Sequence, residues 1–551
     1  MRFKSLCVLL LLCGLCPTKA WADNRFIVRT TNLPALQALC LLPTTCTVVE
    51  GLDGTLGQVF LVTTPLPLET FLGLLQPLAG FVHAEVDQVI NLVTSTLNLV
   101  PSPLPADLMS DRSPAPYPNS GGTVWNSYAN QPAARIVRVS DAQSQFGVTG
   151  SGIVADIDTG VDPTHPALQS VLLPGYDYTR NQPNGSELTD IPSGASCPFS
   201  SCPPPPCPNC PAGQVNQSSA AILDQSSAAI LDGNPQYAAF GHGTMVMGVI
   251  HLVSPAAQLL PLKAFKSDGT GFLSDILRAI YDAVQKYNAN VLNMSFDTQT
   301  WSREFRKALN YANNNNVICA ASAGNDGQSA PPLTVYPAQW QNDVMGVAST
   351  SDLDMRSSFS NYGNAIVWVA APGEAIVTTY PFGTYAAGWG TSFSAPFVSG
   401  GASLLLNRQP TINENGAGQA VAHAVPVGPQ MGNGRLDLVQ ALGSLASAPA
   451  DIPPTGSINS PSGNVVIFAG QSVFFSGSGT DPDGTITAYS WSFPGGNPSS
   501  SNVATPGNVT YSSPGVFVAT FTVTDNAALS DPNPPTRTIY VLPCILFCGV
   551  L

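Results

Sequence analysis

Gly390-Thr-Ser-Phe-Ser-Ala-Pro396 places a serine in a tight turn, and an apolar run over residues 400–406 follows it. A serine hydroxyl is a weak nucleophile unless a neighbouring base takes its proton. We expect a helix to begin at Ser392, because a helix N-terminus favours negative charge and a proline is tolerated in the first turn. Gly-Thr-Ser also occurs in ordinary loops. The stretch therefore predicts a reactive serine only if the chain also supplies a base, a group that orients it and an oxyanion donor.

Candidates for these three groups precede the serine. Asp158 ends an apolar, strand-like run, and His242 lies between two glycines before another apolar segment. Asn325 ends a third buried-strand pattern, and its amide can donate to an oxyanion. Taken singly, these residues have ordinary explanations, as a turn cap, a polar loop residue and a turn former. Together, in the order Asp–His–Ser, they match one of the known chain orders of a catalytic triad.

The blocks around these residues resemble those of the subtilisin-like serine peptidases, the subtilase family. The matching blocks are Asp158-Thr-Gly160, His242-Gly-Thr244, Ala323-Gly-Asn325 and Gly390-Thr-Ser-Phe-Ser-Ala-Pro396. The resemblance implies that Ser392 is the nucleophile, His242 the general base and then acid, and Asp158 the carboxylate that orients His242. It also implies that Asn325 binds the oxyanion together with the Ser392 backbone N–H.

Two segments would form the substrate groove, by the same resemblance. They would pair with an extended peptide as edge strands, which reads backbone rather than side chains. The groove residues expected are Gly269, Gly271, Ser295, Phe296, Asp297 and Gly324.

The first specificity pocket departs from the family pattern. The family usually has Ser-Leu-Gly-Gly where this chain has Ser295-Phe-Asp-Thr298, so Asp297 replaces a glycine, and Asp326 would lie in the opposite wall. Two carboxylates near an apolar pocket would favour a cationic substrate side chain. If both point to solvent, a large apolar side chain fills the pocket instead. Exposed ion pairs are worth only ~0.2–1 kcal/mol, so the sequence slightly favours the apolar side chain.

A metal is not expected to be required. The family's strong calcium site uses an aspartate in a His-Pro-Asp-Leu run, but this chain reads His165-Pro-Ala-Leu168 and lacks the loop after the histidine helix. We therefore predict that this calcium site is absent and that no cofactor is required. The sequence does not decide whether calcium binds elsewhere.

Length and composition suit a multidomain exported protein. The chain has 551 residues, only 10% of them charged, with 49 Gly and 50 Pro and a net charge of −14. That balance argues against a nucleic-acid partner. Residues 1–22 read as a signal peptide, with a charged start, an apolar segment too short to span a membrane and a small-x-small end. We expect a secreted protein, extracellular or periplasmic, without a membrane span and monomeric.

Residues 23–99 predict a small α+β domain, with strands near 26–30, 58–63 and 82–92 and a helix over 68–78. It is similar to the family's propeptide, which would make it the chain's own intramolecular inhibitor; a permanently attached accessory domain is the alternative. Residues 100–133 are rich in proline and serine and read as a linker. Cys40 and Cys46 are expected to pair within this domain.

Residues 134–446 alternate between strand and helix patterns, which predicts an α/β fold with a mostly parallel sheet and helices on both faces. In such sheets, sites collect at the carboxyl ends of the strands. Residues 180–235 read as an insertion. It carries four cysteines that favour disulfides over zinc in an exported chain, at positions 197, 202, 207 and 210. Cys319 reads as a lone core thiol.

After a linker at 447–454, residues 455–541 predict an all-β sandwich that resembles the PKD domain, an immunoglobulin-like module. Such a module can be a spacer or a binding unit. An apolar tail, residues 542–551, follows. We expect a secreted serine endopeptidase that works through an acyl-enzyme. The rival hypothesis is a catalytically idle adhesin on a subtilase scaffold that binds through the PKD-like domain.

Overall fold

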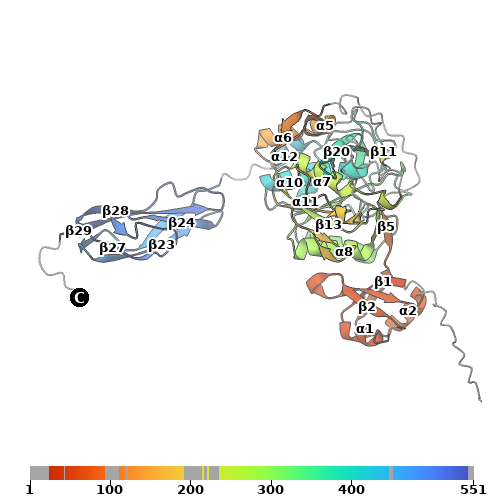
Figure 1. The fold of residues 1–551 in the computed structure, drawn as a ribbon, viewed down its shortest axis with the longest axis horizontal. Helices are drawn as coiled ribbons and strands as arrows, with labels where there is room; N and C mark the ends of the chain where they lie inside the picture. The colour runs from red at the N-terminus through yellow and green to blue at the C-terminus, as the bar shows by residue number, and fades with distance from the viewer. Residues whose placement is uncertain are drawn as a thin grey trace, which may run out of the picture. The chain divides into compact units, whose positions relative to one another are not determined.

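The computed structural model describes residues 24–42, 44–92, 111–118, 122–191, 214–215, 220–222, 235–445 and 451–543. The chain divides into two compact units, Met1–Ala446 and Ser447–Leu551, and each is described by itself (Figure 1). The predicted signal peptide, the four clustered cysteines and the end of the apolar tail lie outside the described residues.

The N-terminal part of the first unit is a four-stranded sheet in the order β2-β3-β1-β4. Its elements are β1 (Asn24–Thr30), α1 (Leu33–Leu39), β2 (Thr47–Gly51), a 3₁₀ turn η1 (Gly54–Leu56), β3 (Val59–Thr64), α2 (Leu68–Leu75) and β4 (Phe81–Val86). The sheet is antiparallel throughout. Alternate residues of β1 and β3, Phe26, Val28, Phe60 and Val62, are buried together with Phe71 of α2. The predicted strands and helix of this domain are thus present; β2 and α1 were not predicted.

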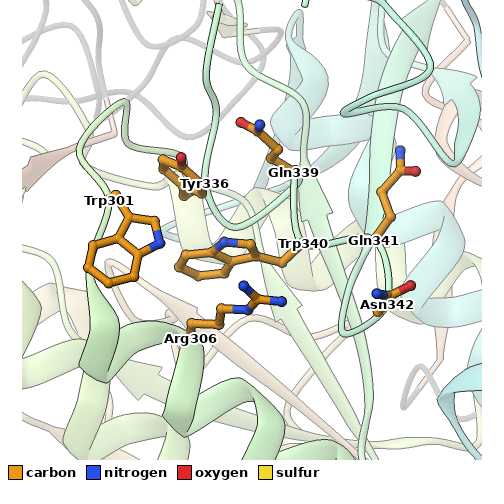
Figure 2. Close-up of a pocket in the computed structure, with 7 residues that line it drawn as sticks. All are labelled: Trp301, Arg306, Tyr336, Gln339, Trp340, Gln341 and Asn342. Atoms are coloured by element: carbon orange, nitrogen blue, oxygen red, sulfur yellow. The ribbon is translucent and has the colours of Figure 1, made fainter.

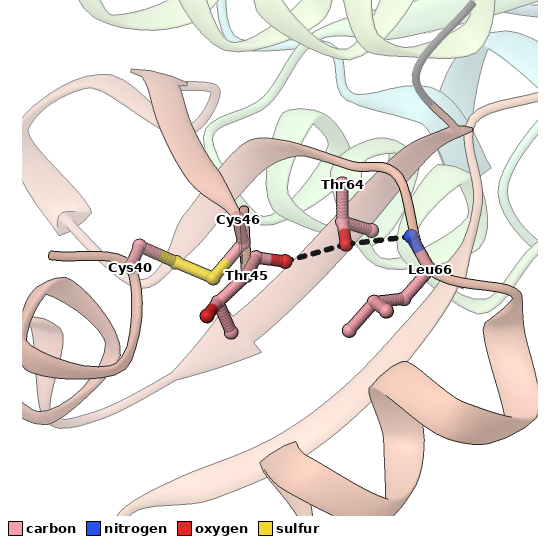
Figure 3. The surroundings of a disulfide bond; sticks show 5 residues. All are labelled: Cys40, Thr45, Cys46, Thr64 and Leu66. Atoms are coloured by element: carbon pink, nitrogen blue, oxygen red, sulfur yellow. Dashed lines mark hydrogen bonds between the residues drawn. A yellow bond between two sulfur atoms is a disulfide. The ribbon is translucent and has the colours of Figure 1, made fainter. Parts of the chain in front are cut away.

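The predicted Cys40–Cys46 disulfide is present and joins the end of α1 to the start of β2 (Figure 3). Close to it, the Thr64 hydroxyl donates to the carbonyl of Thr45 at 2.6 Å and accepts the N–H of Leu66 at 3.1 Å. The bridge and this hydrogen-bonded corner fix the loop before β2 against the end of β3. Cys319, by contrast, is buried and unpaired, as predicted.

The main sheet has eight strands in the order β10-β9-β13-β8-β15-β16-β17-β18. Its central pairs are parallel. The bounds of the strands are β8 (Ile153–Asp158), β9 (Tyr176–Asp177), β10 (Gln182–Pro183), β13 (Gln258–Lys263), β15 (Val291–Met294), β16 (Ile318–Ser322), β17 (Met345–Thr350) and β18 (Val369–Pro372). Residues 182–183, which fell within the expected insertion, therefore belong to this sheet.

Helices cover both faces of the sheet, as the alternating pattern predicted. They are α7 (His242–Val253) and α10 (Thr391–Arg408) on one face, and α8 (Leu273–Gln285) and α9 (Arg303–Asn314) on the other. Successive strand residues point to opposite layers: Val154 packs in the core with α7 and α10, whereas Ala155 packs in the core with α8 and α9. This confirms the predicted fold class.

Residues 111–118 and 122–133 are not the linker that their composition predicted. They form β6 (Pro114–Pro116), β7 (Thr123–Trp125), α4 (Asn126–Ala129) and the start of α5 (Pro132–Ile136). Tyr128 is fully buried and donates to the carbonyl of Gly248 at 2.7 Å, and the Gln131 amide donates to Val377 at 2.6 Å. Aromatic burial and these bonds hold the segment on the first unit.

The remaining elements of the first unit are β5 (Val89–Asn91), α6 (Val139–Phe146), two 3₁₀ turns η2 (Glu187–Asp190) and η3 (Pro235–Tyr237), β11 (Gln214–Val215), β12 (Ala220–Ile222), β14 (Thr270–Phe272), β19 (Ile376–Tyr380), β20 (Thr384–Gly388), α11 (Glu414–Val421) and α12 (Leu438–Ser444). None of the helices in the described ranges has a stretch long and apolar enough to cross a bilayer.

The second unit is all β, as predicted. Two sheets, β21-β23-β27-β25 and β22-β29-β28-β24-β26, enclose a core around Phe475, Trp491 and Phe521. The strands are β21 (Thr455–Ser460), β22 (Val465–Phe468), β23 (Ser472–Thr480), β24 (Ile486–Ser492), β25 (Gly496–Asn497), β26 (Ser500–Ser501), β27 (Gly507–Tyr511), β28 (Gly515–Asp525) and β29 (Thr536–Leu542).

Candidate active site

Asp158 and His242 form a buried hydrogen-bonded pair. Asp158 is the last residue of β8 and His242 the first of α7, and each is 1% exposed. Both carboxylate oxygens lie 2.8 Å from Nδ1 of the imidazole, and the N–H of Thr159 donates to Asp158 Oδ1 at 2.6 Å. A carboxylate at Nδ1 fixes the proton on that nitrogen and leaves Nε2 as a base. Within the described residues, His242 Nε2 is buried and has no hydrogen-bond partner.

Ser392 is the second residue of α10, next to a residue that packs on the histidine. The ring of Phe393 lies 5.9 Å from the imidazole of His242. Ser392 is 3% exposed, and its hydroxyl donates to the carbonyl of Ser295 at 3.1 Å. Backbone N–H groups in the first turn of a helix lack partners within the helix. The start of α10 therefore offers donors as well as a hydroxyl.

Asn325 follows β16 and is tied to the same helix start. Its Oδ1 accepts the N–H of Thr391 at 2.9 Å and the Thr391 hydroxyl at 3.0 Å. Because the amide oxygen is occupied in this way, the amide NH₂ group is the part left to donate. That orientation is the one an oxyanion donor needs.

Asp156, two residues before Asp158, belongs to a different buried chain of hydrogen bonds. Its Oδ1 accepts from the Asn293 amide at 2.9 Å, and that amide also donates to the Ser295 hydroxyl at 3.0 Å. The Ser295 hydroxyl donates in turn to the carbonyl of Ser392 at 2.9 Å. Burial, and then the charge of Asp158, raise the pKa of Asp156 well above its usual range. Asp156 therefore supports the start of α10 through this chain of hydrogen bonds, whereas Asp158 contacts the imidazole directly.

Glu187 joins the two segments that carry the Asp–His pair. The side chain is fully buried. Its Oε2 accepts the N–H of Gly241 at 2.7 Å and the Thr159 hydroxyl at 3.1 Å. Its Oε1 accepts the Thr244 hydroxyl. Gly241 precedes the histidine and Thr159 follows the aspartate. Burial raises the pKa of Glu187 to about 8. One carboxyl group thus fixes the spacing between β8 and α7.

Lys263 anchors the loop that follows Asp158. Its ammonium group is fully buried and donates to the carbonyls of Thr159 and Phe265, at 2.8 and 2.7 Å, and to Asp190 at 2.9 Å. A buried ammonium is tolerated only when its donors are satisfied, and here three acceptors satisfy them. The loop after Asp158 is therefore held by charge as well as by packing.

The edge strand expected to bind substrate is occupied by the chain itself. β14 pairs antiparallel with β5, with Gly271 opposite Ile90, and the N–H of Leu92 donates to the carbonyl of Gly269 at 2.9 Å. A Cβ on Gly271 would lie 2.5 Å from the carbonyl oxygen of Ala264, which explains the glycine. Residues 89–92 thus add a strand where a peptide would add one.

Acidic residues of the N-terminal domain cap two helices of the main sheet. Asp87 accepts the N–H and the hydroxyl of Ser274, both at 2.8 Å, at the start of α8. Glu85 accepts the hydroxyl of Ser302 and the N–H of Arg303 at the start of α9. Carboxylates at helix N-termini are favourable through both hydrogen bonds and the helix dipole.

A buried ion pair reinforces this interface. The guanidinium of Arg29 in β1 donates to both carboxylate oxygens of Glu304 in α9, at distances from 2.6 to 3.1 Å. Bidentate charge-assisted pairs are the strong ones. The N-terminal domain therefore docks through specific polar contacts.

The other expected groove residues lie around Gly324. Ser295 and Phe296 are buried at the end of β15, and Asp297 follows them. A Cβ on Gly324 would lie 3.1 Å from Asp297 Oδ2, so the two segments approach closely there. The structure thus brings Ser295, Asp297, Gly324 and Asn325 to one place, beside Ser392.

A separate pocket of about 380 Å³ is lined in part by Tyr336, whose backbone pairs with that of Thr298 through two 2.8 Å hydrogen bonds. In Figure 2 the rings of Trp301, Tyr336 and Trp340 stand together, and Arg306 extends from α9 toward them. The amides of Gln339, Gln341 and Asn342 complete the lining. None of the residues lining this pocket is one of the expected catalytic residues.

The fold is an α/β fold, a mostly parallel sheet with helices on both faces. Beside the carboxyl ends of its strands lie a carboxylate–imidazole pair and a serine at a helix start, which is the arrangement of an α/β serine hydrolase. The model of the subtilase family matches residues 150–443, more than half of the chain, and the model of the PKD domain matches residues 458–533. The chain belongs to the subtilase family.

Its relatives include subtilisin NAT of Bacillus subtilis subsp. natto, 36% identical over 188 residues that cover 32% of this chain and 49% of that protein. Thermitase of Thermoactinomyces vulgaris is 30% identical over 270 residues, 47% of this chain and 76% of that protein. A solved lanthipeptide protease aligns with a TM-score of 0.44 at 22% identity, over 57% of this chain and 94% of that chain. The chain spans about half the length of subtilisin NAT and of subtilisin E.

Sequence reasoning missed Glu187, Lys263 and Asn293. Lys263 had a usable signal, since a charged residue that ends an otherwise apolar strand needs buried partners. Glu187 had none, because it lies in an irregular stretch that was assigned to an insertion. Asn293 is a single polar residue in a four-residue strand, and its role depends on Asp156 and Ser399, which the fold alone brings to it.

Proposed function

We propose that this chain is a secreted serine endopeptidase that cleaves peptide bonds of protein substrates through Asp158, His242 and Ser392. The observation that carries the proposal is the imidazole of His242, held at Nδ1 by a buried carboxylate while Nε2 stays without a partner close to a helix-borne serine. Among the described residues, the buried His251 also lacks partners at its ring nitrogens, so the carboxylate at Nδ1 and the neighbouring serine are what set His242 apart.

The proposed reaction begins when the Ser392 hydroxyl turns from the Ser295 carbonyl toward His242. Ser392 Oγ attacks the substrate carbonyl carbon while its proton passes to Nε2. The negative charge that develops on the carbonyl oxygen is bound by the Asn325 amide and the Ser392 N–H. The intermediate then collapses; the amine leaves with the proton from His242, and the acyl group stays on Ser392. Water, deprotonated by His242, hydrolyses this ester and restores the serine.

We also propose that residues 23–99 inhibit the enzyme until they are removed. Two features support this: the occupation of the β14 edge by β5, and the caps that Glu85 and Asp87 place on α8 and α9. Export is supported by the pattern of residues 1–22 and by the Cys40–Cys46 disulfide, since disulfides persist in oxidising compartments.

The test is labelling of the purified full chain with a serine-reactive fluorophosphonate. The wild type should be labelled, and Ser392→Ala should lose labelling and peptide hydrolysis and accumulate as a precursor that retains residues 23–99. Ser394→Ala is the matched control, because Ser394 is buried in the same helix and donates only to the Pro372 carbonyl, at 3.2 Å. An unlabelled but folded wild type would favour the idle adhesin.

A further inference from the structure

Asp297 lies where the substrate residue that precedes the cut must place its side chain. That side chain starts one bond from the carbonyl carbon that Ser392 would attack. It must therefore enter the space between the segment after Ser295 and the segment before Asn325. A Cβ on Gly324, where φ is +90°, would lie 2.5 Å from the Asn361 amide nitrogen and 3.1 Å from Asp297 Oδ2, so both side chains border this place.

The carboxylate of Asp297 lacks a counter-charge. No hydrogen bond or ion pair among the described residues involves this carboxylate. Its neighbour Asp326 is different, since Asp326 Oδ2 accepts from the Asn361 amide at 2.9 Å. That amide also donates to the Ala323 carbonyl at 3.1 Å and is therefore committed. The pocket thus has one carboxylate that is satisfied and one that is not.

Asp297 does not point out to open solvent, contrary to the arrangement that the sequence slightly favoured. Its side chain is half-buried, and protein encloses it closely enough that burial, followed by the charge of Asp326, raises the pKa of its carboxyl to about 7. A half-buried carboxylate is screened less by water and salt than an exposed one. Its attraction for a cation is therefore larger than that of an exposed pair.

We propose that Asp297 selects substrates with a lysine or arginine side chain immediately before the cut. This inference rests on the proposed peptidase function and names its substrate class. The ammonium or guanidinium group supplies the counter-charge that Asp297 lacks, and the aliphatic stem of the side chain fills the apolar part of the pocket. Phe296, which is buried, belongs to the core rather than to the pocket opening.

The test compares kcat/KM for matched peptide amides with Lys, norleucine, Phe or Glu before the cut. Lys and norleucine have stems of similar size, so their ratio isolates the charge. We expect the full chain, after self-processing, to prefer Lys over norleucine by about 10- to 100-fold, the value of a hydrogen bond to a charged group. Asp297→Asn should bring that ratio to about one. Asp326→Asn is the matched control and should change the Lys/norleucine ratio less than about threefold.

Two conditions test the same charge without a variant. The Lys/norleucine ratio should rise as the pH passes upward through about 7, because the carboxyl ionises there, and it should fall as salt increases. Both readouts remain decisive if Asp297→Asn fails to fold. A ratio at or below one in the wild type, or a ratio that Asp297→Asn leaves unchanged, overturns the proposal. These outcomes can be distinguished from a failure of the proposed peptidase function, in which no peptide is cut and fluorophosphonate does not label Ser392.

Discussion

Glu187→Gln should make the protein less sensitive to alkaline pH. Burial raises the pKa of this carboxyl from 4.5 to about 8, so the folded state holds a proton that the unfolded chain gives up above about pH 4.5. Stability from Glu187 is therefore fully present at low pH and is lost as the pH rises toward 8. The shift corresponds to about 5 kcal/mol once the group is ionised in the folded state.

A glutamine reproduces the neutral form of Glu187. Its carbonyl oxygen can accept from Gly241 and Thr159, and its NH₂ group can donate to the Thr244 hydroxyl. We expect the free energy of unfolding at pH 5 to change by less than about 1 kcal/mol. At pH 9 the variant should be several kcal/mol more stable than the parent, since it has no charge to bury.

Urea unfolding at pH 5, 7 and 9 measures both quantities. A Ser392→Ala background prevents self-digestion in either chain. Glu69→Gln is the control, because Glu69 is an exposed carboxylate in the first turn of α2 and should leave the pH dependence unchanged. A loss of more than about 3 kcal/mol at pH 5, or the same pH slope in both chains, would refute the neutral form and require an ionised Glu187.

Asn325→Leu should lower kcat by ~100- to 1,000-fold with KM nearly unchanged, because the amide donates to charge that exists only in the transition state. Steady-state kinetics measure both constants. A change mainly in KM would show that Asn325 holds substrate instead. Asp87→Ala removes the cap of α8 and should loosen the docked N-terminal domain by about 1–2 kcal/mol. Limited trypsin digestion of the Ser392→Ala precursor should then remove that domain roughly 5- to 30-fold faster, while Glu69→Ala digests at the parent rate. Since His165-Pro-Ala-Leu168 lacks the aspartate of the family's strong calcium site, EDTA should leave peptide hydrolysis unchanged; rapid loss of activity that calcium restores would contradict this.

The strands that could be predicted from the sequence are those marked by a local pattern of apolar and turn residues. β1 and β3 lie where strands were predicted, near residues 26–30 and 58–63, because short apolar runs bounded by turn residues define a buried strand. Residues 122–133 show the limit of that approach. Their proline and serine content predicts a linker, whereas Tyr128 and Gln131 are buried by contacts with residues more than 100 positions away.

The candidate site divides in the same way. Asp158, His242, Asn325 and Ser392 could be proposed from the sequence because each lies in a short motif. Their supports were not found, because Glu187 and Lys263 act through partners that only the folded chain assembles. The same holds for Asp297, whose enclosure follows from the packing of two loops and could not be deduced from its position in the sequence.

The pairing of β5 with β14 has a consequence for when the enzyme would work. While the chain is continuous, residues 89–92 are tethered to the edge they occupy, at an effective concentration on the order of millimolar. A free peptide with the same intrinsic affinity for the edge must exceed that concentration to displace them. Once the chain is cut between the two segments, their association becomes bimolecular and weakens with dilution. If residues 23–99 act as the proposed inhibitor, release into a large volume would then complete the activation that the cut begins.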